Sequence, residues 1–449
     1  MTRPSDGPAS SGGFLLNVNL VFIATVAAAG LGFITAVLLA RTLGPEGRGV
    51  TALYQAAVSL GFAFLGLGIS TAIFFYLGRR DITGRQAMEA GLSVTLIATA
   101  LSAIGVGIAA LAFGQNLVDE DVPYWLAVVV IPALVQFRAV EAVLRAQGRF
   151  GRMNLLEISL PLSILGLLGA VELLDGLTIY RAVVAWSLAF LPPVVLGYAL
   201  LGPSEWPRRL AARDLLLKAA GFGMQGQLSN LIQLLNYRLD SYLVLLLVNA
   251  SGVGLYAVGV SLSEGMWLIA NSVSVVLLTN LTASDEENAA RMTPIVCRNT
   301  LLVTAAGSVV AAALAPYAIP AIFGDAFDDA IVPFLWLLPG TVALAGTKIL
   351  ASYVFSRGRP LINAQIAFVT LVITVVADLL LIPAFEVSGA AAASSFAYCF
   401  SLALSAVAYR RISGGSISQA LLPRPDDAIY YADGLRSLAR RFRRSEARP

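Results

Sequence analysis

The sequence has no histidine, two cysteines and two lysines among its 449 residues. Without an imidazole, and with two thiols far apart in the chain, histidine-based catalytic triads and the usual zinc sites are excluded. Cys297 and Cys399 lie in or beside apolar segments, so they indicate no disulfide framework. Charged residues are also scarce, at 13% of the chain, compared with about 25% in soluble globular proteins. We therefore expect transport rather than catalysis, with no catalytic residues, no metal site and no cofactor.

Apolar residues make up 58% of the chain, and the mean hydropathy is +0.80. A water-soluble fold of this size could not cover so much apolar surface with polar side chains. A helix needs about 20 apolar residues to cross about 30 Å of hydrocarbon. Twelve blocks meet this requirement, near residues 14–40, 51–78, 88–113, 124–144, 153–173, 179–201, 219–247, 254–283, 296–317, 331–355, 361–384 and 387–409. The sequence thus predicts an all-α polytopic membrane protein with twelve transmembrane helices.

Arginine is concentrated in alternate connections between these blocks, as expected for the cytoplasmic side of a membrane. Examples are Arg79, Arg80 and Arg85 after the second block, and Arg145, Arg149 and Arg152 after the fourth. The intervening connections are acidic or neutral, with one exception, where Arg41 and Arg48 would face outward beside Glu46. This distribution predicts a membrane protein with both termini in the cytoplasm. Because the arginines fall between apolar blocks rather than on one patch, we expect no nucleic-acid partner.

The two halves of the chain resemble each other. Residues 53–60 (LYQAAVSL) align with residues 255–262 (LYAVGVSL), and residues 145–149 with 355–359. Both members of each pair fall on the same side of the predicted topology, which indicates parallel six-helix repeats. We expect two pseudo-symmetric bundles, residues 14–201 and 219–411, around a central cavity, although chance similarity among small apolar residues is the alternative. Residues 1–13, a linker at 202–218 and a basic tail at 412–449 would be cytoplasmic.

Five short runs carry a resemblance to a known family. The run ARTLGPEGRG at residues 40–49 is accompanied by LGLGISTA at 65–72, YRLD at 237–240 with GVGLY at 252–256, and QGRF at 147–150. These motifs resemble those of the Wzx-like polysaccharide and oligosaccharide flippases of the multidrug/oligosaccharidyl-lipid/polysaccharide exporter superfamily, over residues 14–411. The resemblance implies movement of a polyprenyl-diphosphate-linked glycan from the inner to the outer leaflet of the bacterial cytoplasmic membrane. Glycine and proline at positions 44, 45, 47 and 49 fit a tight turn rather than a binding site.

The seventh block carries a polar stripe. Its members recur at offsets of 4, 4, 3 and 4 residues and are Gln225, Ser229, Gln233, Asn236 and Asp240. On a helix these positions fall within about 80° of one another. Amides and hydroxyls there could line a wet cavity and bind sugar hydroxyls, whereas hydrogen bonding between helices is the alternative. Arg238 projects from the opposite side, and we count it with the stripe as a substrate-binding candidate.

The eighth block places Glu264, Trp267 and Asn271 on one helix face, at spacings of 3 and 4 residues. A carboxylate this deep in a membrane span could bind a coupling cation or a proton, which makes Glu264 and Asn271 candidates for a coupling-ion site. A structural ion pair is the alternative. Near the outer end of the eleventh block, Asp378 would be wetted by the membrane interface.

Two cations inside the membrane are candidates for a diphosphate site, which the family resemblance calls for. Arg138 belongs to a ladder with Glu141 and Arg145 at i, i+3 and i+7, and its planar fork matches phosphate oxygens. These residues could instead pair only with one another. Lys348 in the tenth block has no carboxylate three or four residues away and is the most isolated cation in the membrane.

These observations and the resemblance together predict a flippase whose partners are the lipid-linked glycan, membrane lipids and other glycan-assembly membrane proteins. A multidrug or cation antiporter of the same superfamily is an alternative, which would favour a more acidic cavity. A membrane glycosyltransferase or polymerase should show a large outer loop or paired carboxylates, and the loops are short. A non-transporting component of a glycan-assembly complex is the remaining alternative.

Overall fold

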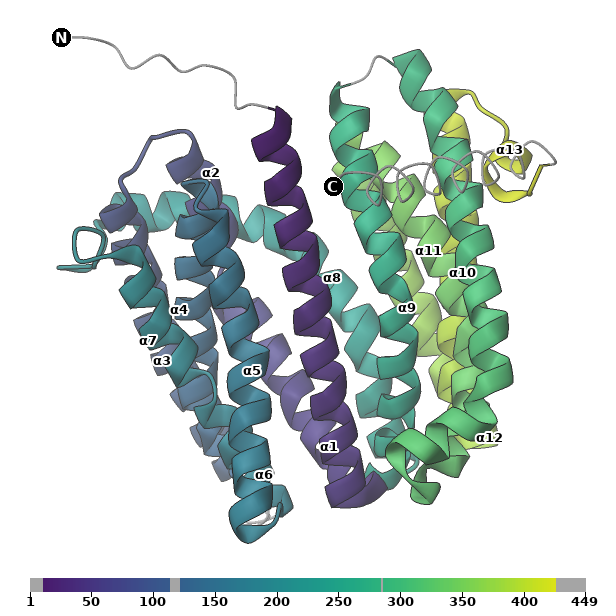
Figure 1. Cartoon of the computed structure of the whole chain (residues 1–449), viewed down its shortest axis with the longest axis horizontal. Coiled ribbons are helices and arrows are strands. Elements are labelled where there is room, and N and C mark those ends of the chain that lie inside the picture. The colour runs from purple at the N-terminus through teal and green to yellow at the C-terminus, as the bar shows by residue number, and fades with distance from the viewer. Residues whose placement is uncertain (1–10, 114–121, 284–285, 425–449) are drawn as a thin grey trace, which may run out of the picture. The chain divides into compact units, whose positions relative to one another are not determined.

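The computed structural model describes residues 11–113, 122–283 and 286–424, and within these ranges the chain is helical with no strand (Figure 1). The first seven helices are α1 (Ser11–Leu65), α2 (Ile69–Gly78), α3 (Gly84–Phe113), α4 (Ala127–Ala146), α5 (Phe150–Asp175), α6 (Ile179–Leu188) and α7 (Leu191–Leu201). They are followed by α8 (Arg213–Leu247), α9 (Ala250–Ala283), α10 (Glu286–Phe323), α11 (Ile331–Ser356), α12 (Pro360–Ser413) and α13 (Ile417–Leu421). Two short 3-10 helices, η2 (Tyr124–Leu126) and η3 (Asp325–Ala330), precede α4 and α11.

Twelve helical segments of these ranges are long enough to cross a membrane, and eleven of them lie in stretches that are also apolar enough. Nine stretches of the described chain are both long and apolar enough to cross a membrane. One of these, residues 179–201, is formed by α6 and α7 together. Two of the nine are double, because α1 is broken at Gly44 (φ 68°, ψ −174°) and α12 at Glu386 (φ 51°, ψ −130°). The 35-residue α8, the most polar of the long helices, adds the last. The predicted all-α, twelve-helix, multi-pass membrane fold is therefore confirmed.

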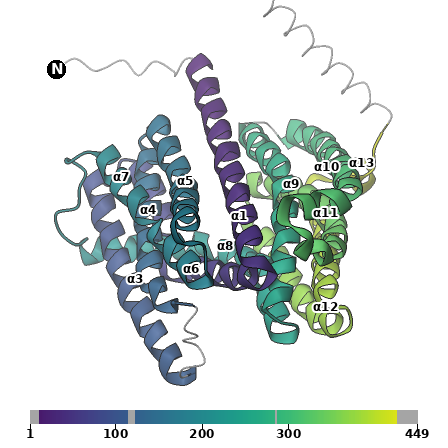
Figure 2. The same ribbon diagram turned by 60° about the horizontal axis from the view of Figure 1, so that its bottom comes forward.

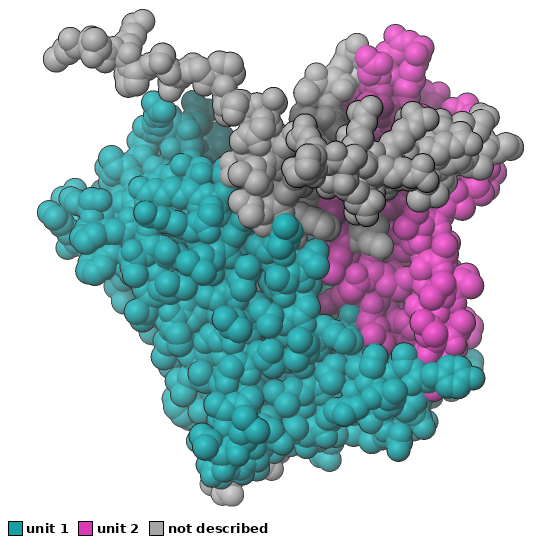
Figure 3. Space-filling model, viewed as in Figure 1, with its two compact units in different colours: residues 1–261, 317–331, 382–387 teal, residues 262–316, 332–381, 388–449 magenta. Residues whose placement is uncertain are grey.

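The chain divides into two compact units, drawn in teal and magenta in Figure 3. Unit 1 comprises residues 1–261, 317–331 and 382–387, and unit 2 comprises residues 262–316, 332–381 and 388–449. Helices α3, α4, α5 and α7 lie side by side in unit 1 (Figures 1 and 2). Unit 1 also includes α8 and the start of α9. The division of the chain into two six-helix bundles, residues 14–201 and 219–411, stays a prediction.

Each unit has its own apolar core. The core of unit 1 is built mainly by α3 and α4, with Met88, Phe137, Leu144 and Leu156 fully buried. The core of unit 2 gathers Leu281, Cys297, Tyr353 and Tyr409 at one end of its helices. Dispersion contacts in these cores hold the helices in place, because hydrocarbon outside the bundle is as apolar as the core.

The arginine pair that breaks the charge pattern has a structural explanation. Arg41 Nε donates to the carbonyl of Ile322 at 2.7 Å, and its Nη2 donates to the carbonyl of Ala321. Those carbonyls belong to the last turn of α10, where hydrogen-bond acceptors lack partners within the helix and the helix dipole is negative. Arg48 is buried, at 6% exposure. Both side chains are therefore engaged within the protein, which accounts for arginine in this connection.

The repeated stretches occupy comparable places in unit 1. The first begins shortly after the break at Gly44, and the second lies in the first turns of α9. Their tyrosines, Tyr54 and Tyr256, are both buried, and each hydroxyl is bonded to a polar side chain. A buried phenol needs such a partner to offset the loss of hydration. The tyrosine of each motif is thus buried and bonded in a similar way.

Candidate functional site

Lys348 lies in a cluster of polar and aromatic side chains within unit 2. From α11 its Nζ donates to Asn271 Oδ1 of α9 at 2.6 Å and stands 4.9 Å from the centroid of the Trp267 ring. Glu264, on the same face of α9, interacts with it electrostatically. We call Glu264, Trp267, Asn271 and Lys348 the Lys348 cluster. It combines a residue predicted to bind diphosphate with both residues predicted to bind a coupling ion.

The geometry of the cluster follows from the two helices. Positions 264, 267 and 271 face one side of α9, and Lys348 has no acidic residue within one turn of its own helix. Its partners therefore come from the neighbouring helix. Asn271 is exposed, Lys348 is half-buried and Trp267 is buried. An ammonium group has three N–H donors, so the bond to Asn271 leaves Lys348 with further donors for an anionic ligand.

Sequence reasoning missed the part that Trp267 plays here. The indole ring faces the ammonium at a distance typical of cation–π pairs. It also packs edge-on against Tyr398 of α12, with the ring centroids 6.5 Å apart. Its position three residues after Glu264 indicates that it shares the face, but no sequence pattern indicates the lysine opposite.

Arg138 lies in the ladder predicted for α4. Its Nη1 contacts Glu141 Oε2 at 2.7 Å, and Arg145 bonds the other oxygen of the same carboxylate. The Glu141 side chain is 5% exposed, whereas those of Arg138 and Arg145 are 41% and 48% exposed. Glu157 of α5 interacts electrostatically with the ladder. Because a guanidinium has five N–H donors, pairing with Glu141 leaves Arg138 able to bind a second anion.

The described residues of the polar stripe of α8 differ in burial: Asn236 and Asp240 are buried, whereas Gln233 is half-buried. Asp240 is buried at 2% exposure, accepts a hydrogen bond from Tyr256 of α9 and accepts another from the amide of Ser241 at 2.8 Å. Asn236 is buried at 1% and donates to the carbonyl of Ile232 at 3.1 Å. Asp240 therefore makes a hydrogen bond between helices. This is the alternative to a wet cavity that the sequence left open.

The other predicted residues of α8 differ in exposure. Gln233 and Arg238 are half-buried. The side chains of Gln225 and Ser229 lie outside those that the structure describes. Nearby, Gln227 Nε2 donates to the carbonyl of Ala63 at 3.3 Å, so this amide helps to attach α8 to α1. The structure does not bring the whole stripe onto one open surface.

Asp378 departs from its predicted environment. It was expected to be wetted by the membrane interface, yet it is fully buried in unit 2. Thr370 and Thr374, two turns and one turn before it on α12, are buried as well. The prediction was wrong because distance from a helix end says nothing about which face of the helix packs inward.

Comparisons with known proteins agree with the fold. A family model described as "Polysaccharide biosynthesis protein" matches residues 14–278. No curated protein sequence matches the chain. Among solved structures, lipid II flippase MurJ in an inward closed conformation is similar with a TM-score of 0.69 and 13% identity, covering 88% of this chain and 90% of MurJ.

Two transporters of the MOP superfamily are similar as well. An inward-facing multidrug resistance MATE family transporter gives a TM-score of 0.67 at 15% identity, covering 86% of this chain and 94% of that one. A transporter from Pyrococcus furiosus gives 0.65 at 14% identity, covering 89% and 96%. These identities show the fold alone. Because the family model spans more than half of the sequence, the chain belongs to the polysaccharide biosynthesis protein family, on the twelve-helix fold of the MOP superfamily transporters.

Proposed function

We propose that the protein flips a polyprenyl-diphosphate-linked oligosaccharide from the inner to the outer leaflet of the bacterial cytoplasmic membrane by alternating access. The observation that carries the proposal is Lys348, a cation within a membrane span whose hydrogen bond goes to a neutral amide. A charge in that environment is costly and marks a functional position by default. Membership of a polysaccharide biosynthesis family supports a glycan as the cargo.

Lys348 in unit 2 and Arg138 in unit 1 are each a candidate for binding the diphosphate. Each is partly accessible and each retains donors beyond its present partner. The bidentate fork of arginine and the compact charge of lysine both suit phosphate oxygens. Since Glu141 already neutralises part of the charge of Arg138, we assign the larger share of diphosphate binding to Lys348.

The sugar-binding role falls on the less buried part of the α8 stripe. We assign Gln233 and Arg238 to sugar contacts because both are half-buried, and we retain Gln225 and Ser229 as candidates on the same stripe. Asn236 and Asp240 are too buried to reach a sugar without a rearrangement. Their role would be to set how α8 packs against α9, through the bond between Asp240 and Tyr256.

Coupling would involve Glu264 and Asn271. Asn271 Oδ1 already accepts a hydrogen bond from Lys348, so the ammonium occupies a position that a coupling cation would need. We therefore propose that a cation, or a proton on Glu264, and the Lys348 pairing exclude each other. A diphosphate that attracts Lys348 would free Glu264 and Asn271, which links cargo binding to ion binding.

A multidrug or cation antiporter is the second candidate, because MATE transporters share the fold. The cations at positions 138 and 348 disfavour a cationic cargo by direct repulsion. A non-transporting component of a glycan-assembly complex is the third. A catalytic role is the least supported, since family and fold point to transport.

The experiment is deletion of the gene followed by extraction of lipid-linked glycans. The flippase predicts an inner-leaflet pool of lipid-linked glycan that wild-type protein clears and the Arg138→Ala/Lys348→Ala double variant does not. Protein level in the membrane is the control. Normal surface glycan with altered drug resistance would favour the antiporter, and normal glycan without any transport phenotype would favour the non-transporting component.

A further inference from the structure

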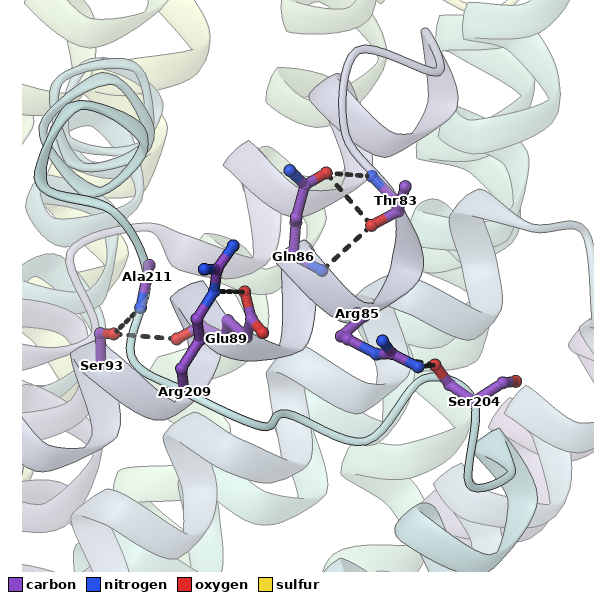
Figure 4. A network of polar contacts seen from close by, with 8 residues as sticks. All are labelled: Thr83, Arg85, Gln86, Glu89, Ser93, Ser204, Arg209 and Ala211. Atoms are coloured by element: carbon purple, nitrogen blue, oxygen red, sulfur yellow. Dashed lines mark hydrogen bonds and ion pairs between the residues drawn. The ribbon is translucent and has the colours of Figure 1, made fainter.

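The connection between α7 and α8 is bonded to other helices of unit 1 along its length. We call residues 202–213 the strap. At its start, the carbonyl of Ser204 accepts hydrogen bonds from Arg85 Nη2 at 2.8 Å and Nε at 3.1 Å (Figure 4). Arg149 Nη1 contacts Glu205 Oε2 at 2.9 Å, and the Trp206 indole donates to the carbonyl of Tyr198 at 2.9 Å. These contacts fix the backbone of the first half of the strap.

The second half of the strap is fixed by α3. The amide of Ala211 donates to Ser93 Oγ at 2.9 Å, and Arg209 Nε lies 3.7 Å from Glu89 Oε2 (Figure 4). Glu89 and Ser93 are one turn apart on α3 and are both buried. Polar bonds to buried partners hold a segment more strongly than bonds in water do. The strap is therefore a fixed surface element.

The strap and the first two turns of α8 present positive charge outward. Arg208, Arg209, Arg213 and Lys218 are exposed, and the Arg209 side chain is 81% exposed even though it contacts Glu89. Asp214 is the exposed acidic residue within 202–218, since Glu205 is buried in its contact with Arg149. The exposed charge of this surface is thus strongly positive.

Apolar side chains are interspersed with these charges. Trp206 is 44% exposed, Leu210 is 55% exposed and Leu217 is 60% exposed. The strap joins two membrane spans, and α8, at 35 residues, is about 50 Å long, longer than the roughly 30 Å hydrocarbon core. A helix of this length can place its first turns, and the strap before them, in the head-group region. Tryptophan and leucine beside basic residues are typical of segments at that depth.

We propose that the strap and the first two turns of α8 form a binding surface for the head groups of anionic phospholipids. The basic side chains would bind lipid phosphates, while Trp206, Leu210 and Leu217 enter the boundary between head groups and acyl chains. The distribution of arginine places this surface on the cytoplasmic leaflet, where anionic lipids supply the matching charge. The surface is independent of the proposed cargo site.

The experiment uses the full chain in nanodiscs of phosphatidylcholine with or without phosphatidylglycerol brominated near the glycerol. Fluorescence that Trp206→Phe removes is assigned to Trp206, and we expect brominated phosphatidylglycerol to quench it more than equally brominated phosphatidylcholine does. In native mass spectrometry, the Arg208→Gln/Arg213→Gln/Lys218→Gln variant should retain phosphatidylglycerol more weakly, on the order of fivefold per charge removed. These residues are exposed, so the variant should fold.

The matched control is Arg291→Gln/Arg410→Gln/Arg411→Gln, which removes three exposed charges from other predicted cytoplasmic positions. We expect this control to retain phosphatidylglycerol as the wild type does. Equal loss in both triple variants would overturn the proposal, because a general charge effect would then explain retention. Equal quenching by the two lipids, or displacement of phosphatidylglycerol by inorganic phosphate at matched concentration, would overturn it as well.

Discussion

Gly49 and Gly254 pack backbone against backbone in unit 1. A Cβ atom added at Gly49 would lie 1.9 Å from the carbonyl oxygen of Ala250, and one added at Gly254 would lie 1.8 Å from that of Pro45. Real Cβ atoms cannot approach backbone atoms so closely. The first motif of the sequence therefore brings the start of the second span against the start of α9. Its glycines allow helix contact in addition to the turn at Gly44.

Alanine at Gly254 should disrupt this contact. We expect Gly254→Ala to destabilise the protein by about 1–3 kcal/mol, because the backbone of α1 or α9 must shift to admit a methyl group. Thermal unfolding of the purified protein in detergent measures the change. Gly265→Ala on the same helix is the control, since nothing lies within 4 Å of its added Cβ. Equal melting temperatures for the two variants would contradict the close approach.

Loss of the Lys348 charge should impair export. Lys348→Ala is expected to lower glycan export by roughly tenfold or more, the usual effect of losing a hydrogen bond from a charged group. The rate of surface-glycan synthesis, at equal protein level, is the measurement. Lys348→Arg keeps the charge and should retain part of the activity. An unchanged rate in Lys348→Ala would remove this residue from the mechanism.

Removing the same charge should favour cation binding at Glu264 and Asn271. With Lys348→Gln, the ammonium no longer occupies Asn271 Oδ1, so sodium or a proton should bind more tightly. Calorimetric titration of sodium into wild type, Lys348→Gln and Lys348→Gln/Glu264→Gln measures the effect. We expect tighter binding in the single variant and its loss in the double variant. Identical sodium affinity in all three would show that the Lys348 cluster does not bind the ion.

Glycine at position 386 should stabilise the protein. Glu386 is exposed and has φ 51°, a value that costs a residue with a side chain about 1–2 kcal/mol. Glu386→Gly removes this strain and should raise the melting temperature, whereas Glu386→Ala keeps the Cβ atom and should not. A similar rise for both variants would point to the loss of charge as the cause.

The sequence predicted well those features that depend on local composition. The number of spans follows from apolar length, and the breaks at Gly44 and Glu386 fall in predicted connections. The ladder of Arg138, Glu141 and Arg145 follows from helical spacing. Features that depend on packing between distant segments were not predictable. The contact of Lys348 with Asn271 joins residues 77 positions apart, and the bond of Asp240 to Tyr256 depends on how two helices pack.

The burial of Asp378 illustrates the same limit from one helix. Periodicity identifies the members of a helix face, as it did for Glu264, Trp267 and Asn271. It does not show which face packs inward when the outer surface is also apolar, as it is in a membrane. Polar residues in a membrane helix can mark either a face buried in protein or a face that lines water. Only the contacts in the structure distinguish the two.

The central claim is tested most directly by reconstituting the purified protein into vesicles that carry a fluorescent polyprenyl-diphosphate oligosaccharide in both leaflets. An impermeant glycosidase is then added outside. The flippase account predicts that wild-type protein makes the inner-leaflet glycan accessible to the enzyme, while Arg138→Ala/Lys348→Ala leaves it protected. Protection in wild-type vesicles equal to that in protein-free vesicles, under every ion gradient and membrane potential applied, would contradict the account.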